Sequence, residues 1–142
     1  MESQFRTYYV NYLLRVLSDI KTIYRECECV KKNNSNKKHP RIDNVIQYNG
    51  KYLGVEVKLN VNIEPDLIGQ LNKYYNADEI KITDNKVIYK KEIHNGILVI
   101  DTEHIYYFDG TELNNILSLD MIKSLLDIKD AKKKIDNAII HK

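Results

Sequence analysis

The 142 residues of this chain are enough for one domain, which can bury a hydrophobic core without disulfides or a structural metal. A net charge of +2 excludes a general attraction to nucleic acid, so any such binding must come from local clusters of basic residues. No apolar run approaches the roughly 20 residues of a membrane span, and the N-terminus lacks a secretory pattern. We therefore expect an intracellular, cytoplasmic domain without a membrane partner.

The first predicted elements are a helix and a short strand. From about Gln4 to Tyr24, apolar residues recur at the i, i+3, i+4 and i+7 spacing of a helix. A strand is predicted from Glu26 to Lys31, and it contains both cysteines of the chain, Cys27 and Cys29. Residues two apart on a strand stand too far apart for easy bridging, so we expect reduced, structural thiols. The alternative is a metal site shared between subunits.

A polar loop from Lys32 to Lys38 separates this strand from the next one. The loop and the residues after it carry a cluster of basic side chains, among them Lys37, Lys38, His39 and Arg41. Such a cluster can bind phosphates without regard to base sequence, in a manner that depends on salt. We expect these residues to contact nucleic acid if a catalytic site lies next to them. A solvated surface loop is the alternative.

A β-hairpin is the clearest prediction in the chain. Its strands run from Arg41 to Tyr48 and from Lys51 to Leu59, and Asn49-Gly50 between them is the dipeptide that most strongly indicates a two-residue turn. Apolar residues alternate with Gly54 and charged residues along the second strand. This alternation predicts one face in the core and one face that carries the charges.

The register of this hairpin brings two acidic residues together. If Tyr48 faces Lys51, then Asp43 stands directly opposite Glu56, with Cβ atoms about 4.5–5.5 Å apart. Two carboxylates at that spacing can bind one divalent cation, and Lys58 projects from the same face. The alternative is an exposed sheet face on which Lys58 forms a cross-strand salt bridge.

The remaining elements alternate between helix and strand. A helix is predicted from Pro65 to about Asn76, with Gln70 and Tyr74 four residues apart on one face. The C-terminal part, from Glu112 to Ile140, has a helical pattern of apolar residues. Together these elements predict an α/β fold in which helices flank a mixed sheet. Four strands are predicted between the two helices: Glu79 to Thr83, Lys86 to Ile93, Gly96 to Thr102 and His104 to Asp109.

These residues resemble the motif of the PD-(D/E)XK nuclease superfamily. The match consists of Arg41-Ile42-Asp43, with the proline displaced to Pro40, followed by Glu56-Val57-Lys58. The helical segment from Gln70 to Tyr74 looks like the Gln-x-x-x-Tyr motif of RecB-like nucleases, and the size and element order are similar to archaeal Holliday-junction resolvases. The resemblance covers roughly residues 1–110. It implies a restriction-endonuclease-like fold in a single nuclease domain of residues 1–142, with a C-terminal helical segment at about 112–140.

The resemblance also implies roles for individual residues. Asp43, Glu56 and the main-chain carbonyl of Val57 would bind magnesium or manganese, and Lys58 would hold the attacking water or offset charge on the phosphate. Gln70 and Tyr74 would brace the site or touch the substrate backbone.

The implied activity is metal-dependent hydrolysis of DNA phosphodiester bonds by an endonuclease or structure-selective nuclease. We expect a homodimer, because a domain of this size has little surface with which to enclose a duplex. A non-catalytic nucleic-acid-binding module of the same fold and a ribonuclease that uses the same triad are the alternatives.

Overall fold

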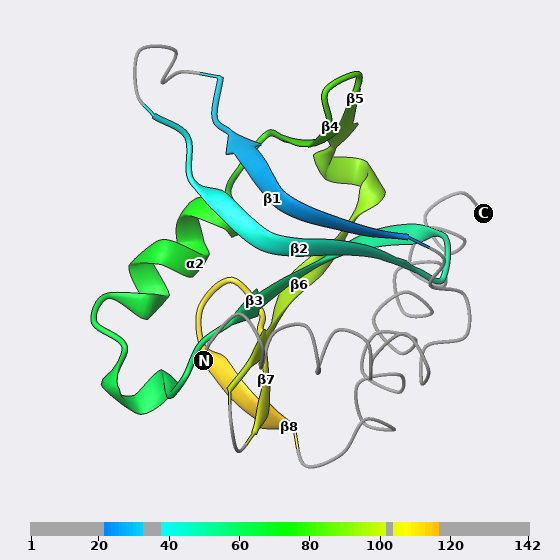
Figure 1. The fold of residues 1–142 in the computed structure, drawn as a ribbon. Coiled ribbons are helices and arrows are strands. Elements are labelled where there is room, and N and C mark those ends of the chain that lie inside the picture. The colour runs from blue at the N-terminus through cyan, green and yellow to red at the C-terminus, as the bar shows by residue number, and fades with distance from the viewer. Residues whose placement is uncertain (1–21, 33–37, 102–103, 117–142) are drawn as a thin grey trace, which may run out of the picture.

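An eight-stranded mixed sheet dominates the computed structural model, which describes residues 22–32, 38–101 and 104–116 (Figure 1). The order of its strands is β5-β4-β1-β2-β3-β6-β7-β8, and all pairs are antiparallel except β3 with β6. The strands are β1 (Ile23–Val30), β2 (Arg41–Tyr48), β3 (Lys51–Val57), β4 (Glu79–Thr83), β5 (Lys86–Tyr89), β6 (Ile93–Ile100), β7 (Ile105–Phe108) and β8 (Leu113–Ile116).

The hairpin of β2 and β3 has the register expected from its turn. Tyr48 lies opposite Lys51, and the turn residues Asn49 and Gly50 have φ values of 51° and 80°. Positive φ at both central positions is the property for which Asn-Gly is selected in a two-residue turn. The hairpin prediction is therefore confirmed, although β3 ends at Val57, two residues before the predicted end.

One α-helix is present among the described residues, and it lies on one face of the sheet. This helix, α2 (Leu67–Tyr75), follows β3, and the chain then forms the β4–β5 hairpin before returning in β6 parallel to β3. Short 3-10 turns, η1 (Val61–Ile63) and η2 (Lys90–Glu92), interrupt the connections. No helix of the described residues is long and apolar enough to cross a membrane.

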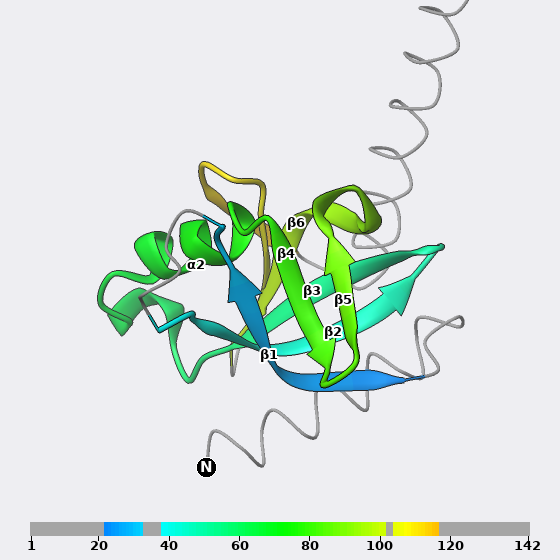
Figure 2. The same ribbon diagram turned by 90° about the horizontal axis from the view of Figure 1, so that it is seen from above.

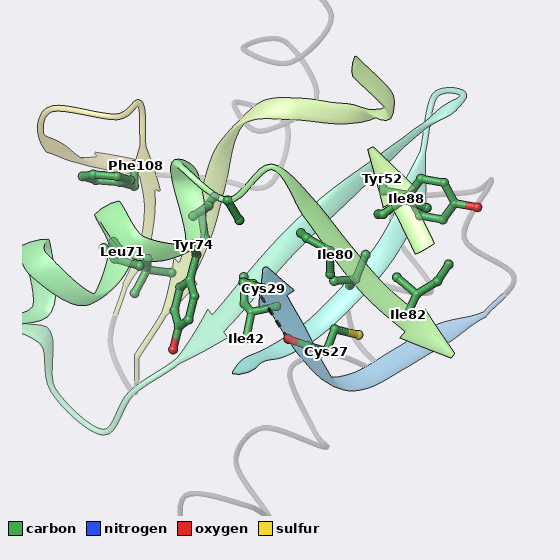
Figure 3. Packing of buried hydrophobic residues seen from close by; sticks show 14 of the residues in the cluster. Cys27, Cys29, Ile42, Tyr52, Leu71, Tyr74, Ile80, Ile82, Ile88 and Phe108 are labelled. Atoms are coloured by element: carbon green, nitrogen blue, oxygen red, sulfur yellow. Dashed lines mark hydrogen bonds between the residues drawn. The ribbon is translucent and has the colours of Figure 1, made fainter. Parts of the chain in front are cut away.

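The sheet curls, so that strands far apart in the order approach each other (Figure 2). Lys86 on β5 donates a hydrogen bond from Nζ to the Tyr52 hydroxyl on β3, at 3.0 Å, although three strands separate β5 from β3 in the sheet. Inside the curl, side chains of α2, including Leu71 and Tyr74, pack with residues of β1, β2 and β4 in one hydrophobic cluster (Figure 3). The curl therefore creates an interior around which the sheet and α2 close.

A second hydrophobic cluster covers the opposite face of the central strands. It contains Ile46, Leu53, Val55, Leu98 and Tyr107, among others. With a core on each face, β3 is buried on both sides from Tyr52 to Val57. The expectation of a charged, open face on this strand is wrong, because α2 and the curled sheet cover it.

The expected α/β class, with helices flanking a restriction-endonuclease-like sheet, is wrong for the described residues, which form a mainly-β structure with α2 on one face. Where a C-terminal helix is predicted to begin, at Glu112, the chain forms β8 instead. The pairing of β8 with β7 overrides the helical spacing of its apolar residues. Similarly, β1 already includes the last two residues of the predicted first helix. The remaining parts of both predicted helices, residues 4–21 and 117–140, lie outside the described residues.

The two cysteines provide a test of this core. Cys27 and Cys29 are free and buried, and burial raises the pKa of the first thiol to about 11 and of the second to about 12. Because the thiolate is the reactive form, we expect neither thiol to react with a disulfide reagent at pH 8 until the protein unfolds. The reaction of the two cysteines is measured along a urea titration by the absorbance of the coloured thiol that the disulfide reagent releases. Rapid reaction of both thiols in the absence of urea would contradict the described core.

Candidate functional site

The strands β2 and β3 separate at Asp43 and Glu56. Their backbone pairing runs from the turn to Asn44 opposite Val55. Beyond this point, the Asp43 N–H donates to Oε1 of Glu56 at 3.1 Å, and the Val57 N–H donates to Oδ2 of Asp43 at 2.9 Å. Hydrogen bonds to the two carboxyl groups thus follow where the backbone pairing of the strands stops. The structure brings Asp43 and Glu56 together, as the hairpin register predicts.

The backbone on the other side of Asp43 is also irregular. Pairs between β1 and β2 lie on either side of Glu26, which has a φ of 51°, a conformation that L-residues rarely adopt. Within β2, Ile42 and Val45 belong to the same hydrophobic cluster, although regular alternation would send residues three apart to opposite faces. The register of β1 and β2 is the same on both sides of Glu26, so the backbone is irregular there without an inserted residue.

Glu56 is only 1% exposed, and this burial is the main determinant of the charge state of its carboxyl. Burial raises the pKa of its carboxyl to about 8, and the Asp43 carboxyl adds to the rise through a hydrogen bond and charge repulsion. The nearby Tyr74 hydroxyl acts in the opposite direction and lowers this pKa. Near neutral pH and without a cation, Glu56 therefore holds a proton next to Asp43.

The predicted supporting residues, Gln70 and Tyr74, lie beside these carboxyls. Tyr74 projects from α2 toward the sheet next to Ile42 (Figure 3). Its hydroxyl accepts a hydrogen bond from Nε2 of Gln70 at 2.8 Å and donates one to the main-chain oxygen of Arg41 at 3.2 Å. Burial and the nearby Glu56 raise the pKa of Tyr74, so its hydroxyl keeps its proton. The helix is thereby attached to β2 two residues before Asp43.

Lys58 directly follows β3, and both its main chain and its side chain are held by contacts. Its N–H donates to the main-chain oxygen of Ile100 on β6 at 2.9 Å, and its Nζ lies 3.4 Å from Oε1 of Glu64. The Lys58 side chain is only 13% exposed. The alternative of an exposed sheet face with a Lys58 salt bridge is excluded by the burial of Glu56.

Oxygen atoms are the available metal ligands at this site. In an extended strand the N–H and C=O of one residue point to the same side, and the Val57 N–H points toward Asp43, so the Val57 carbonyl faces this side as well. Two carboxylates and a carbonyl suit a hard cation such as magnesium or manganese. Among the described residues, no cluster of three or more His, Cys, Asp or Glu side chains is present.

The predicted phosphate-binding residues lie along a hollow beside the site. Lys38, His39 and Arg41 line this hollow together with Lys31 and Lys73, and its volume is about 720 Å³. We call it the basic groove. Lys37, which belongs to the same prediction, lies outside the described residues.

Two acidic residues near Lys58 were not found from the sequence. Glu64 forms its ion pair across a loop, where no spacing rule applies. Asp101, buried at the end of β6, accepts hydrogen bonds from the N–H groups of Val61 at 3.2 Å and His104 at 2.7 Å, and so holds the segment after β3.

Comparisons of the chain with protein-family models, curated proteins and solved structures give no match.

The buried carboxyl predicts a pH-dependent stability. The folded pKa of Glu56, about 8, exceeds its ordinary value of 4.5, so folding binds a proton between these values. The contribution of Glu56 to the free energy of unfolding should therefore fall as the pH rises from about 4.5 to about 8. In EDTA, urea unfolding at pH 5 and pH 8 should show a smaller difference for Glu56→Gln than for the wild type. The control Glu112→Gln, at an exposed residue, should keep the wild-type difference, and equal behaviour of both variants would contradict the prediction.

The effect of the Tyr74 hydroxyl should be measurable in the titration of Glu56. Tyr74→Phe removes the hydroxyl that lowers the pKa of Glu56, so this pKa should rise further. The loss of the bonds to Gln70 and Arg41 should cost about 1 kcal/mol of stability. NMR titration of glutamate side-chain carbons measures the first effect and urea unfolding the second. The control is Tyr75→Phe at the next residue, where an unchanged Glu56 titration is expected; a Tyr74→Phe titration identical to the wild type would disprove the contact.

Proposed function

We propose that this chain is a metal-dependent nuclease of the PD-(D/E)XK type, which hydrolyses DNA phosphodiester bonds as an endonuclease or structure-selective nuclease. The observation that carries the proposal is the pair of carboxyls at the separation of β2 and β3, one of which is buried with a strongly raised pKa. Strongly perturbed carboxyls with a specific charged partner are frequent at catalytic sites.

In this proposal, Asp43, Glu56 and the Val57 carbonyl hold one magnesium or manganese ion. When bound, the ion lowers the pKa of a water molecule and polarises a phosphoryl oxygen. The protein fixes both carboxyls through main-chain hydrogen bonds, so little reorganisation is needed on binding. Burial of Glu56 excludes competing water from one side of the site.

Lys58 supplies fixed positive charge beside the scissile phosphate. Hydrolysis joins the oxygen of water to phosphorus and breaks the bond to the leaving oxygen, while negative charge grows on the phosphoryl oxygens. The ammonium group of a largely buried side chain acts strongly on such charge, because it is only partly screened by water. Glu64 holds Nζ in place, and Tyr74 and Gln70 keep α2 against the strand that carries Asp43.

Cleavage assays test the proposal directly. Purified protein should cut labelled DNA in manganese or magnesium and not in EDTA, and linear duplex, single-stranded, circular and four-way-junction substrates define its preference. Glu56→Gln should abolish cutting, and Lys58→Ala should slow it by about 10²–10³-fold, the effect of losing one charge-stabilising group. Lys91→Ala, which removes an exposed lysine elsewhere, is the control and should cut as the wild type does. Full activity of Glu56→Gln would refute the proposal.

A metal titration separates the nuclease from a non-catalytic binding module. Calorimetry with manganese should give binding to the wild type and none to Asp43→Asn, whereas the binding module requires no dependence on Asp43. Cleavage of RNA alone would indicate the ribonuclease instead. The homodimer expected from the chain length stays a prediction, which sedimentation equilibrium measures.

A further inference from the structure

The basic groove carries charge that the proposed catalytic site does not use. It lies between α2 and the segment that enters β2, and its described lining contains lysine, arginine and histidine but no aspartate or glutamate. Lys38 lies in the segment before β2 and Lys73 on α2, so positive charge lines the hollow from two segments, while Arg41, which also lines it, stands opposite Glu28 on β1. A concave surface of one charge raises the local concentration of the opposite charge.

The cations of the groove are largely available to a ligand. Lys38, Arg41 and Lys73 form no ion pair with a described residue. Lys31 lies 3.7 Å from Asp78 and donates to the main-chain oxygen of Asn76 at 3.0 Å, so this side chain is partly neutralised, and Arg41 has Glu28 opposite it on β1. Lys38 and Lys73 line the hollow with like charge, and a polyanion would relieve their repulsion.

The groove adjoins the carboxyl pair through two residues. Arg41 lines the groove, and its main-chain oxygen accepts the hydrogen bond from Tyr74. Lys73 also lines the groove and precedes Tyr74 on α2, whose hydroxyl lies near Glu56 and lowers the pKa of that carboxyl. The groove and the carboxyl pair therefore lie close to each other, on either side of the contact between Arg41 and Tyr74.

We propose that the basic groove binds the sugar-phosphate backbone of a single-stranded polynucleotide and leads it to the carboxyl pair. This inference rests on the proposed function and specifies its substrate class. The volume of about 720 Å³ lies within the range of about 300–1,000 Å³ for small-ligand sites, which admits a few nucleotides but not a double helix. A positively charged groove along the backbone is the common feature of proteins that bind single strands without sequence preference.

Binding is tested in EDTA, where no cation is bound and no cleavage occurs. Fluorescence anisotropy with a labelled dT 12-mer should give tighter binding than a duplex of the same length. If four cations contact phosphates, the slope of log K against log salt should be about −2.8, which corresponds to about 50-fold weaker binding at 200 mM than at 50 mM salt. A U 12-mer in the same assay shows whether DNA and RNA strands are distinguished.

Two matched double variants locate the binding. Arg41→Gln/Lys73→Gln removes two cations of the groove and should reduce the magnitude of the salt slope by about 1.4. The control Lys81→Gln/Lys91→Gln removes the same charge from exposed residues on β4 and η2 and should bind as the wild type does. Circular dichroism verifies that both variants are folded.

Three outcomes would overturn the inference: duplex binding as tight as single-strand binding, an equal loss in the control variant, or an unchanged slope in Arg41→Gln/Lys73→Gln. Because these measurements need no cleavage, a failure of the groove assignment can be told apart from a failure of the proposed function. Tight, groove-dependent binding by a protein that never cuts DNA would contradict the nuclease and leave the groove assignment intact.

Discussion

The exchange of hydrogen bonds between Asp43 and the backbone around Glu56 is the interaction on which the rest of the site depends. Where β2 and β3 separate, each strand would leave N–H groups without a partner in a nearly dry environment, which is unfavourable. The carboxyl of Glu56 accepts one N–H and the carboxyl of Asp43 accepts another. The strands can therefore part here, and their parting leaves two acidic groups side by side.

This arrangement places two acidic groups where water cannot solvate both. Desolvation is the largest contribution to the raised pKa of Glu56, and repulsion by Asp43 adds to it. Such a pair is stable only with a proton or a cation between its members. The same geometry that satisfies the backbone therefore creates a demand for positive charge, which the proposed function assigns to magnesium or manganese.

Helix α2 connects this pair to the surface. Its buried side contributes Leu71 and Tyr74 to the core, and Tyr74 is bonded to β2 through Arg41. The residue before Tyr74, Lys73, lines the basic groove. One short helix thus packs the core, braces the carboxyls and forms one wall of the groove, which explains why site and groove adjoin.

Much of the hairpin and of its carboxyl pair could be predicted, because the information is local. Asn49-Gly50 fixes the turn, the turn fixes the register, and the register determines which residues stand opposite each other. The four-residue spacing of Gln70 and Tyr74 similarly places them on one helix face, as observed. These relations involve neighbouring residues, and no distant contact can easily override them.

The fold class could not be predicted, because it depends on distant contacts. The curl of the sheet brings β5 against β3, and α2 then covers the face that carries Glu56, so that a strand with an alternating pattern is buried on both sides. Likewise, Leu113 and Ile116 have a spacing compatible with a helix, and only the neighbouring strand β7 makes them part of β8.

The sequence by itself determined the hairpin, its register and the proximity of Asp43 and Glu56, since bonds between adjacent strands and a two-residue turn decide these. Tertiary structure alone decided how deeply Glu56 is buried, which acid holds Lys58, and that Lys73 stands across a groove from Arg41. Those properties arise where segments separated in the chain meet, and there the packing of the whole sheet and α2 sets the distances and the solvation.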